Sequence, residues 1–213
     1  MPDVVTCLAL SDNGRWLITG SRDTTVISWE INYFQGVPAV MKRDIFHGHD
    51  DEVTSVAVNT EYDMVLTGSL DGTCIIHSLR SGTYARTLRL SPGDGPSMVK
   101  QVAISNQGSL VVASVKGEEH ELHLFGINGK KLKKIVLKKA PLNAFVISSD
   151  GKYIIIAAHD IIGILLLHSL KGVGEINVGQ SVTVNCLAVP AKGNYILAGL
   201  SDGKLLVVTE KTS

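Results

Sequence analysis

The stretch FHGHDDEVTSVAVNTEYDMVLTGSLDGTCIIHSL, from Phe46 to Leu79, decides the fold of this chain. A Gly-His pair precedes one apolar segment, Val53 to Val58, and a second apolar segment, Met64 to Thr67, follows it. A turn over 68–72, rich in glycine and aspartate, leads into a third segment, Thr73 to Leu79. Short runs of this kind, bounded by turn residues, predict β-strands joined by tight turns.

The same arrangement recurs five times along the chain. Aligned on the first large residue of the VAV motif, the anchors lie 48, 46, 43 and 42 residues apart, at Leu8, Val56, Val102, Phe145 and Leu187. A large residue follows each anchor by eight positions and a small residue follows it by twelve. An aspartate follows by fifteen in four copies, at Asp23, Asp71, Asp160 and Asp202. Repeats of about 40 to 45 residues with four strands each are typical of β-propeller blades.

The repeat predicts an all-β propeller of about five four-stranded blades in a single domain, residues 1–213. The expected blades cover approximately 1–46, 47–90, 98–138, 139–180 and 181–213. In the motifs CLAL, SVAV, QVAI and CLAV, large residues alternate with a small alanine, which suits an innermost strand where the sheets converge.

The sequence begins at a first strand and ends at a third, so we expect an incomplete, open ring. Three explanations stay open: a piece of a longer chain, a closed five-bladed ring, or completion by another chain.

Composition excludes several classes of protein. Twenty basic and twenty acidic residues cancel, so no overall field favours nucleic acid, and we expect no nucleic-acid partner. No apolar run reaches the length of a membrane-spanning helix, and the N-terminus lacks the pattern of a signal peptide. We therefore expect a cytoplasmic protein. The three widely spaced cysteines, Cys7, Cys74 and Cys186, predict buried free thiols.

Several residues make the chain resemble the WD-repeat family. Gly48-His49 precedes a first strand, Gly68 and Asp71 follow a second, and Trp29 lies on a third. The resemblance implies a structural hydrogen-bond network from His through Ser or Thr and Asp to Trp. From the residues alone, Asp71 in a tight turn can accept hydrogen bonds from backbone N–H groups and from His49.

No copy holds the full set of these residues. The first copy has Asp23 and Trp29 without a Gly-His pair, and the second copy has His77 in place of the tryptophan. Asp160 and Asp202 represent the set in the fourth and fifth copies. We therefore expect weaker networks outside the first two copies.

A narrower resemblance is to the C-terminal WD domain of BEACH-domain, neurobeachin-like proteins. It is carried by DVVTCLALS (3–11), GSRDTTVISWE (20–30), GHDDEVTSVAV (48–58), GSLDGTCIIHSL (68–79), INGK (127–130) and LAGLSDGKLLVV (197–208). It implies a non-enzymatic protein-interaction module of a scaffold in membrane or vesicle trafficking, or in lysosome- and autophagy-related pathways. A generic WD-repeat adaptor of a ubiquitin-ligase or signalling complex is the alternative.

Two groups of residues are candidate partner-binding sites. Loops joining second to third strands share a face with the loops between blades, and the resemblance implies that partners dock there; these loops carry Arg22, Asp50, Asp51 and Leu70. Tyr33 and Phe34 lie in an expected long loop, Ile31 to Pro38. These two aromatic side chains either anchor a partner or pack beneath the blade, and the sequence leaves both alternatives open.

No motif points to catalysis or to a bound group. We see no phosphate loop and no nucleophile beside a base, so we expect no enzyme and no cofactor; a hydrolytic propeller would need acid, base or metal groups clustered at its central channel. His47 and His49 are two positions apart beside two aspartates, but a Gly-His turn explains them better than a metal site. His120 and His123 are expected as surface or strand residues without a ligand role.

One local cluster of charge remains, on a predicted fourth strand: Lys130, Lys131, Lys133, Lys134, Lys138 and Lys139. Lysines on an outer strand prevent edge-to-edge pairing, which is the simpler interpretation. The alternative is peripheral contact with an anionic endomembrane.

Overall fold

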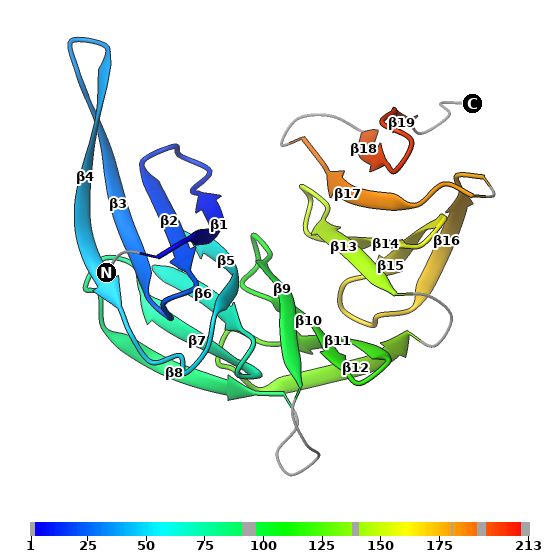
Figure 1. Cartoon of the computed structure of the whole chain (residues 1–213), viewed down its shortest axis with the longest axis horizontal. Coiled ribbons are helices and arrows are strands. Elements are labelled where there is room, and N and C mark those ends of the chain that lie inside the picture. Colours follow the sequence, from blue (N-terminus) through cyan, green and yellow to red (C-terminus); the bar gives the residue numbers. More distant parts are fainter. Residues whose placement is uncertain (1–2, 91–96, 138–140, 180, 191–194, 210–213) are drawn as a thin grey trace.

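The computed structural model describes residues 3–90, 97–137, 141–179, 181–190 and 195–209. Within these ranges 19 strands and no helix are present, and the strands form five separate sheets (Figure 1). Neighbouring strands within each sheet are antiparallel and follow one another in sequence. This is the predicted β-propeller architecture, and the sheets are called blades 1 to 5 below.

The first two blades contain the sequence repeats that are most complete. Blade 1 consists of β1 (Val5–Leu10), β2 (Trp16–Ser21), β3 (Val26–Phe34) and β4 (Val37–Phe46). Blade 2 consists of β5 (Val53–Asn59), β6 (Met64–Ser69), β7 (Thr73–Ser78) and β8 (Tyr84–Arg89). Every residue of β6 is buried, so this strand lies at the centre of the packed structure.

The other three blades follow the same order. Blade 3 consists of β9 (Met98–Ile104), β10 (Leu110–Lys116), β11 (Glu119–Phe125) and β12 (Lys131–Leu137). Blade 4 consists of β13 (Leu142–Ile147), β14 (Tyr153–Ala158), β15 (Ile161–Leu166) and β16 (Gly172–Asn177). Blade 5 has three strands in the described residues, β17 (Val184–Ala188), β18 (Tyr195–Leu200) and β19 (Leu205–Thr209).

The prediction of a long loop over Ile31 to Pro38 is wrong. Strands β3 and β4 continue through it as a hairpin, and only Gln35 and Gly36 separate them (Figure 1). Both residues have positive φ, 52° and 81°, as a two-residue turn that matches the strand twist requires. The pairing of Tyr33 with Pro38 and of Phe34 with Val37 extends the ladder up to this turn.

The hydrophobic core lies between successive blades. Four clusters of buried side chains join blade 1 to 2, 2 to 3, 3 to 4 and 4 to 5. The alternation predicted for the innermost strand is present, since Val56 and Val58 pack toward blade 1 and Ala57 packs toward blade 3. At Gly68 the backbone of β6 approaches Val99 of the next blade so closely that an added Cβ would overlap its side chain.

A repeated side-chain hydrogen bond also joins the innermost strands. Its donor lies two residues before each anchor, and its acceptor is the backbone carbonyl three residues before the next anchor. We call it the inter-blade hydrogen bond. The four pairs are Thr6 Oγ1 to Val53, Thr54 Oγ1 to Val99 (2.8 Å), Lys100 Nζ to Leu142 (2.6 Å) and Asn143 Nδ2 to Val184 (2.9 Å).

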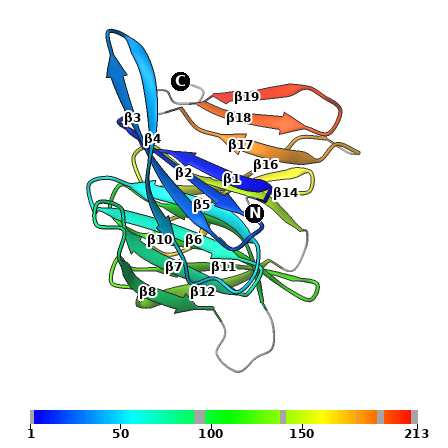
Figure 2. The same cartoon turned by 60° about the vertical axis from the view of Figure 1, so that its left-hand side comes forward.

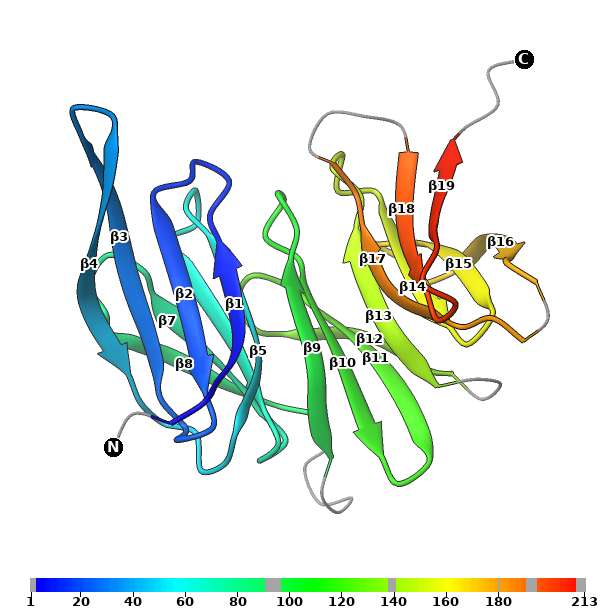
Figure 3. The same ribbon diagram turned by 45° about the horizontal axis from the view of Figure 1, so that its top comes forward.

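The blades follow an open arc, in which blade 1 and blade 5 stand apart at the two ends (Figures 1 and 3). Figure 2 shows the same arc from the side of blade 1. Leu8 in β1 is 68% exposed, whereas its equivalents Val56, Val102 and Phe145 are 7%, 4% and 0% exposed. The difference arises because each equivalent packs against a preceding blade. The expected open ring is therefore confirmed for the described residues.

The open end also corrects the expectation that all cysteines are buried. Cys74 is buried and Cys7 is half-buried, but Cys186 is exposed because no blade covers that face of blade 5 in the described residues. All three thiols are free. Burial raises the pKa of the Cys74 thiol far above its ordinary value. In the ranges that the structure describes, no helix has the length and apolar character needed to span a membrane.

Candidate functional site

His49 and Asp71 form the centre of a hydrogen-bond network in blade 2. The imidazole is buried, with Nδ1 3.0 Å from Asp71 Oδ2 and Nε2 2.7 Å from Thr67 Oγ1. Asp71 also accepts from the backbone N–H groups of Asp50 (3.0 Å) and Thr73 (2.7 Å) and from the Thr73 hydroxyl (2.7 Å). The carboxylate therefore fixes the segment before β5 onto the turn between β6 and β7.

These contacts decide the ionisation of Asp71. Burial alone raises the pKa of a carboxyl group, but the hydrogen bonds from His49, Thr73 and the backbone outweigh it. The pKa of Asp71 is consequently held well below its ordinary value, so the network contains a carboxylate at neutral pH.

Blade 1 holds the other half of the expected network. Trp29 Nε1 donates to Thr19 Oγ1 at 3.0 Å, and Asp23 Oδ1 accepts from the backbone and hydroxyl of Thr25 at 3.1 and 2.6 Å. In blade 2, His77 stands where the tryptophan would be and its Nε2 lies 3.3 Å from the backbone oxygen of His47. The hydrogen bond between Trp29 and Thr19 is therefore in blade 1, whereas the hydrogen bond between His49 and Asp71 is in blade 2.

The threonines that connect these groups were not among the predicted site residues. Thr19 and Thr67 both lie eleven residues after their anchors, on the second strand. Thr67 bonds to His49, and Thr19 bonds to Trp29. The recurrence of threonine at that offset in these two copies was a signal that could have identified both residues.

The remaining aspartates of the repeat are more exposed. Asp202 accepts from the backbone N–H of Lys204 at 3.1 Å and from its Nζ at 2.8 Å, and these bonds lower the pKa of Asp202. Asp160 lies in a two-residue turn between β14 and β15, where its carboxylate is 3.3 Å from His159 Nδ1. Neither aspartate has a buried histidine partner such as His49 in the described chain.

The predicted partner-binding residues Arg22, Asp50, Asp51 and Leu70 lie together with Glu52 at one end of blades 1 and 2. We call these five residues the loop rim. Arg22 Nε is 3.5 Å from Glu52 Oε2, and the backbone N–H of Leu70 donates to the Glu52 carbonyl at 3.0 Å. Ser69 Oγ donates to the Asp51 carbonyl at 2.9 Å. The backbone of the rim is thus fixed, while the side chains of Asp50 and Asp51 are exposed.

Tyr33 and Phe34 are not part of the loop rim. They lie at the tip of the β3–β4 hairpin, at the opposite end of β3 from Arg22, and they are 68% and 66% exposed. Their exposure excludes one of the two alternatives, in which these aromatic side chains pack beneath the blade. Glu30 fixes the base of the hairpin, because its carboxylate pairs with Arg15 at 3.1 Å and Arg43 at 3.3 Å.

The lysine cluster is divided by the structure. Lys134 Nζ is 2.5 Å from Glu121 Oε1, and Lys131 Nζ donates to the Leu90 carbonyl at 2.8 Å, so both contact the chain itself. Lys130 and Lys133 are exposed. Lys138 and Lys139 lie outside the described residues. All four lysines that the structure describes are exposed, and contact of the cluster with an anionic membrane stays a prediction.

A buried polar cluster between blades 2 and 3 was not predicted. Glu121 and His123 both lie on β11 and are buried, so His123 is the expected strand residue and not a surface residue. His123 Nε2 lies 3.2 Å from Glu121 Oε2 and 2.9 Å from Ser114 Oγ. Burial lowers the pKa of His123 to about 4, so the imidazole is neutral at physiological pH.

This cluster lacks the geometry of a catalytic relay. A serine, a histidine and a carboxylate act together when the serine and the carboxylate contact different ring nitrogens. Here both contact Nε2, and Nδ1 has no partner in the described residues. The described residues also contain no group of three or more side chains arranged to hold a metal ion.

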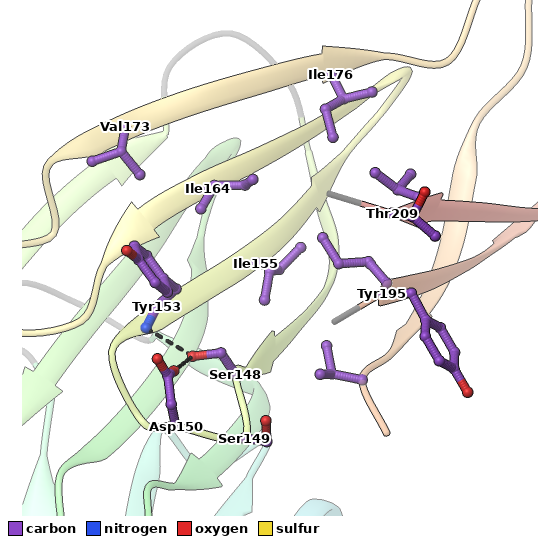
Figure 4. Close-up of a pocket in the computed structure, with 13 residues that line it drawn as sticks. Ser148, Ser149, Asp150, Tyr153, Ile155, Ile164, Val173, Ile176, Tyr195 and Thr209 are labelled. Atoms are coloured by element: carbon purple, nitrogen blue, oxygen red, sulfur yellow. Dashed lines mark hydrogen bonds between the residues drawn. The ribbon is translucent and has the colours of Figure 1, made fainter. Parts of the chain in front are cut away.

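A cavity of about 560 Å³ lies between blades 4 and 5 (Figure 4). Its walls are mainly aliphatic, including Ile155, Ile164 and Ile196. At one end Ser148 Oγ donates to Asp150 Oδ1 at 2.6 Å and accepts from the Tyr153 N–H at 2.9 Å, as the dashed lines in Figure 4 show. These polar groups satisfy each other in the β13–β14 turn, so the cavity presents an apolar surface.

Comparisons with known proteins agree with this geometry. The model of the neurobeachin beta propeller domain matches residues 1–212. BEACH domain-containing protein B of Arabidopsis thaliana is 33% identical over 96% of this chain and 8% of its own length. BEACH domain-containing protein lvsE of Dictyostelium discoideum is 25% identical over 97% of this chain and 10% of its own length.

The solved β-propeller domain of Cps50 (Swd1) from Myceliophteria thermophila has a TM-score of 0.76 at 15% identity; the match covers all of this chain and 68% of that one. It shows the fold alone. The chain spans 8% to 10% of the length of the BEACH relatives just named. The resemblance inferred from the repeat motifs is confirmed, and the chain belongs to the neurobeachin β-propeller domain family.

Proposed function

We propose that this propeller is a non-catalytic protein-interaction module of a BEACH-type scaffold, acting in membrane or vesicle trafficking or in lysosome- and autophagy-related pathways. In this proposal the protein is cytoplasmic and works at the periphery of endomembranes. Family membership and the propeller fold support an interaction module. The observation that carries the proposal is the loop rim, where residues from two blades form one fixed, exposed surface.

The charged side chains of the loop rim indicate which residues a partner should carry. Glu52 is already paired with Arg22, whereas Asp50 and Asp51 are exposed. Two exposed carboxylates beside the half-buried Leu70 favour a partner segment that carries basic residues next to an apolar one. The backbone contacts of Asp71 and Ser69 pre-organise this surface, which reduces the entropy lost on binding.

The rim can be tested by charge reversal with a matched control. The variant Asp50→Lys/Asp51→Lys changes the rim, and Asp12→Lys/Glu61→Lys makes the same change of charge in the exposed β1–β2 and β5–β6 turns at the other end of the same blades. The immobilised wild-type chain and the control are expected to retain a common set of cytosolic proteins. The rim variant is expected to lose those proteins, and about 0.5 M salt is expected to release them because exposed charges are screened.

Retention of cytosolic proteins by the rim variant tests the docking surface, and the identity of those proteins tests the functional class. Equal retention by the rim variant and the wild type would exclude the loop rim as the docking surface. Identification of the retained proteins separates the two functional classes, because ubiquitin-ligase subunits would favour the adaptor alternative over a trafficking scaffold. Thermal melts of each variant establish that a loss of binding does not reflect unfolding.

A further inference from the structure

The outer strands of blades 2 and 3 carry a concentration of positive charge. Strand β8 contributes two arginines, and the segment from Lys130 through β12 contributes four lysines. We call these six exposed residues the basic edge: Arg86, Arg89, Lys130, Lys131, Lys133 and Lys134. Neither β8 nor β12 contains an acidic residue, so no carboxylate on these two strands offsets the charge.

Two hydrogen bonds join β8 and β12 into one surface. Arg86 Nη1 donates to the carbonyl of Asn128, in the turn before β12. Lys131 Nζ donates to the carbonyl of Leu90, directly after β8, at 2.8 Å. The two strands follow each other along the outer side of the arc (Figure 1). Blades 2 and 3 each pack between two other described blades, so the exposure of the basic edge does not depend on where the sequence begins or ends.

Protection against edge-to-edge pairing does not account for this distribution of charge. If the lysines served only that purpose, every outer strand would need a similar set. The outer strand of blade 4, β16, contains Glu175 and no basic residue. The outer strand of blade 1, β4, combines Lys42 and Arg43 with Asp44. The positive charge is therefore concentrated on two adjacent blades, which points to an anionic partner.

Glu121 lies beneath the basic edge and compensates part of its charge. Its carboxylate is buried and pairs with Lys134 Nζ at 2.5 Å. Partial burial of the ammonium group, together with repulsion from Lys134, nevertheless lowers the pKa of Lys131. The cations are therefore closely spaced, and an anion bound from outside would reduce their repulsion.

We propose that the basic edge binds the anionic surface of a phospholipid membrane. Tyr84 and Leu132 lie on the same two strands and are 59% and 55% exposed. Exposed apolar side chains among cations suit the headgroup region of a bilayer, where the cations contact lipid phosphates and the apolar groups enter the interface. The inference rests on the proposed location at endomembranes, but it concerns a surface other than the loop rim.

The geometry favours a membrane over an acidic protein segment. The basic edge follows the outer, convex side of the arc (Figure 1), where a broad surface is reached more readily than by a single bound strand. An acidic segment would use the cations but would leave Tyr84 and Leu132 without an apolar environment. A lipid surface provides both kinds of contact at once.

Co-sedimentation with vesicles tests the proposal. The chain is expected to bind phosphatidylcholine vesicles that contain about one quarter phosphatidylserine, and not vesicles of phosphatidylcholine alone. About 0.5 M salt is expected to weaken the binding because exposed charges are screened. The assay contains no protein partner, so a failure here leaves docking at the loop rim untouched, and a failure of docking at the rim leaves vesicle binding untouched.

Variants in each blade test whether both strands contribute. Arg89→Gln in blade 2 and Lys133→Gln in blade 3 are each expected to weaken vesicle binding about fivefold, and the pair by about twenty-five-fold, since each cation near an anionic surface contributes about that factor. The control pair Lys171→Gln/Lys204→Gln removes two exposed lysines from blades 4 and 5 and is expected to bind as the wild type does. Circular dichroism verifies that each variant is folded.

The apolar contribution is tested separately. Tyr84→Ser/Leu132→Ser keeps every charge of the basic edge and is expected to weaken vesicle binding severalfold, because less apolar surface enters the interface. Vesicle binding that this variant leaves unchanged would contradict contact with the lipid interface.

Two further results would overturn the proposal. One is a wild type that does not bind the vesicles containing phosphatidylserine; if it binds soluble polyglutamate instead, the basic edge belongs to an acidic protein segment. The other is a control pair that weakens binding as much as Arg89→Gln/Lys133→Gln, because net charge and not the basic edge would then decide the affinity.

Discussion

Asp71 illustrates how a single residue of the repeat fixes a loop. Its carboxylate binds three residues that lie on two different segments, His49, Asp50 and Thr73. A buried acceptor with several donors stabilises the fold because removing it leaves those donors without partners. Asp202 occupies the same position in the repeat, but it is exposed, and its side-chain hydrogen bonds within the described residues are to Lys204.

We predict that Asp71→Ala lowers the free energy of unfolding at pH 7 by about 1–3 kcal/mol. Asp202→Ala is the matched control and is expected to change it much less, because Asp202 is exposed. Urea denaturation followed by tryptophan fluorescence measures both values. A penalty for Asp71→Ala no larger than that for Asp202→Ala would contradict a stabilising role of the network.

Acid should remove the advantage of the wild type over Asp71→Ala. The folded state lowers the pKa of Asp71, so its contribution is complete above the ordinary carboxyl pKa of about 4 and declines as the pH falls toward the folded value. We therefore predict that the difference in unfolding free energy between the two chains shrinks between about pH 4 and pH 2. A difference that is constant over this range would show that the carboxylate charge does not matter.

At the scale of the element, the second strand of one blade packs against the innermost strand of the next blade. How closely the two strands approach depends on the size of the residue at that point. Gly68 has no side chain there, and Val99 occupies the space. The residues around this contact belong to a cluster of buried side chains, so the β6–β9 contact leaves little room for rearrangement. Gly199 has the same place in its repeat, and among the described residues a Cβ added there would meet only Cys186 of its own blade.

We predict that Gly68→Ala destabilises the chain by about 1–3 kcal/mol, the usual cost of adding a methyl group to a packed core. Gly199→Ala is expected to cost less, because Cys186 is exposed and its side chain can move aside. Thermal unfolding of both variants in dilute solution tests the comparison. Equal losses of stability would mean that close approach of the blades is not the reason for glycine at this position.

For the whole molecule, stability depends on position along the arc. In a repeat architecture each unit is stabilised chiefly by its immediate neighbours. Within the described residues, blades 2, 3 and 4 are covered on both faces, whereas blade 5 is covered only by blade 4 and has three strands. Local opening should therefore be least costly at the blade 5 end.

We predict that the backbone amides of β17, β18 and β19 exchange with deuterium about tenfold faster, or more, than those of β5, β6 and β7. Hydrogen-exchange mass spectrometry in dilute solution measures this directly. Uniform exchange across all five blades would contradict stability that varies along the arc.

The sequence by itself determined the repeat, the number of blades, the innermost strand and the family. These follow from local patterns, because strand alternation and turn residues depend on neighbours close in the chain. The pairing of His49 with Asp71 was also foreseeable, since both residues lie at the turns of a single repeat. The loop rim was anticipated only as a set of residues on one face.

Only the tertiary structure decided how the repeats interact. It extended the β3–β4 hairpin, placed Tyr33 and Phe34 at its exposed tip, and buried Glu121 and His123 between blades. It also showed that, within the described residues, Leu8 lacks the contacts of its equivalents in other blades. Burial and satisfied hydrogen bonds are properties of contacts between residues some 40 positions apart, and no local pattern records which of those contacts a given copy makes.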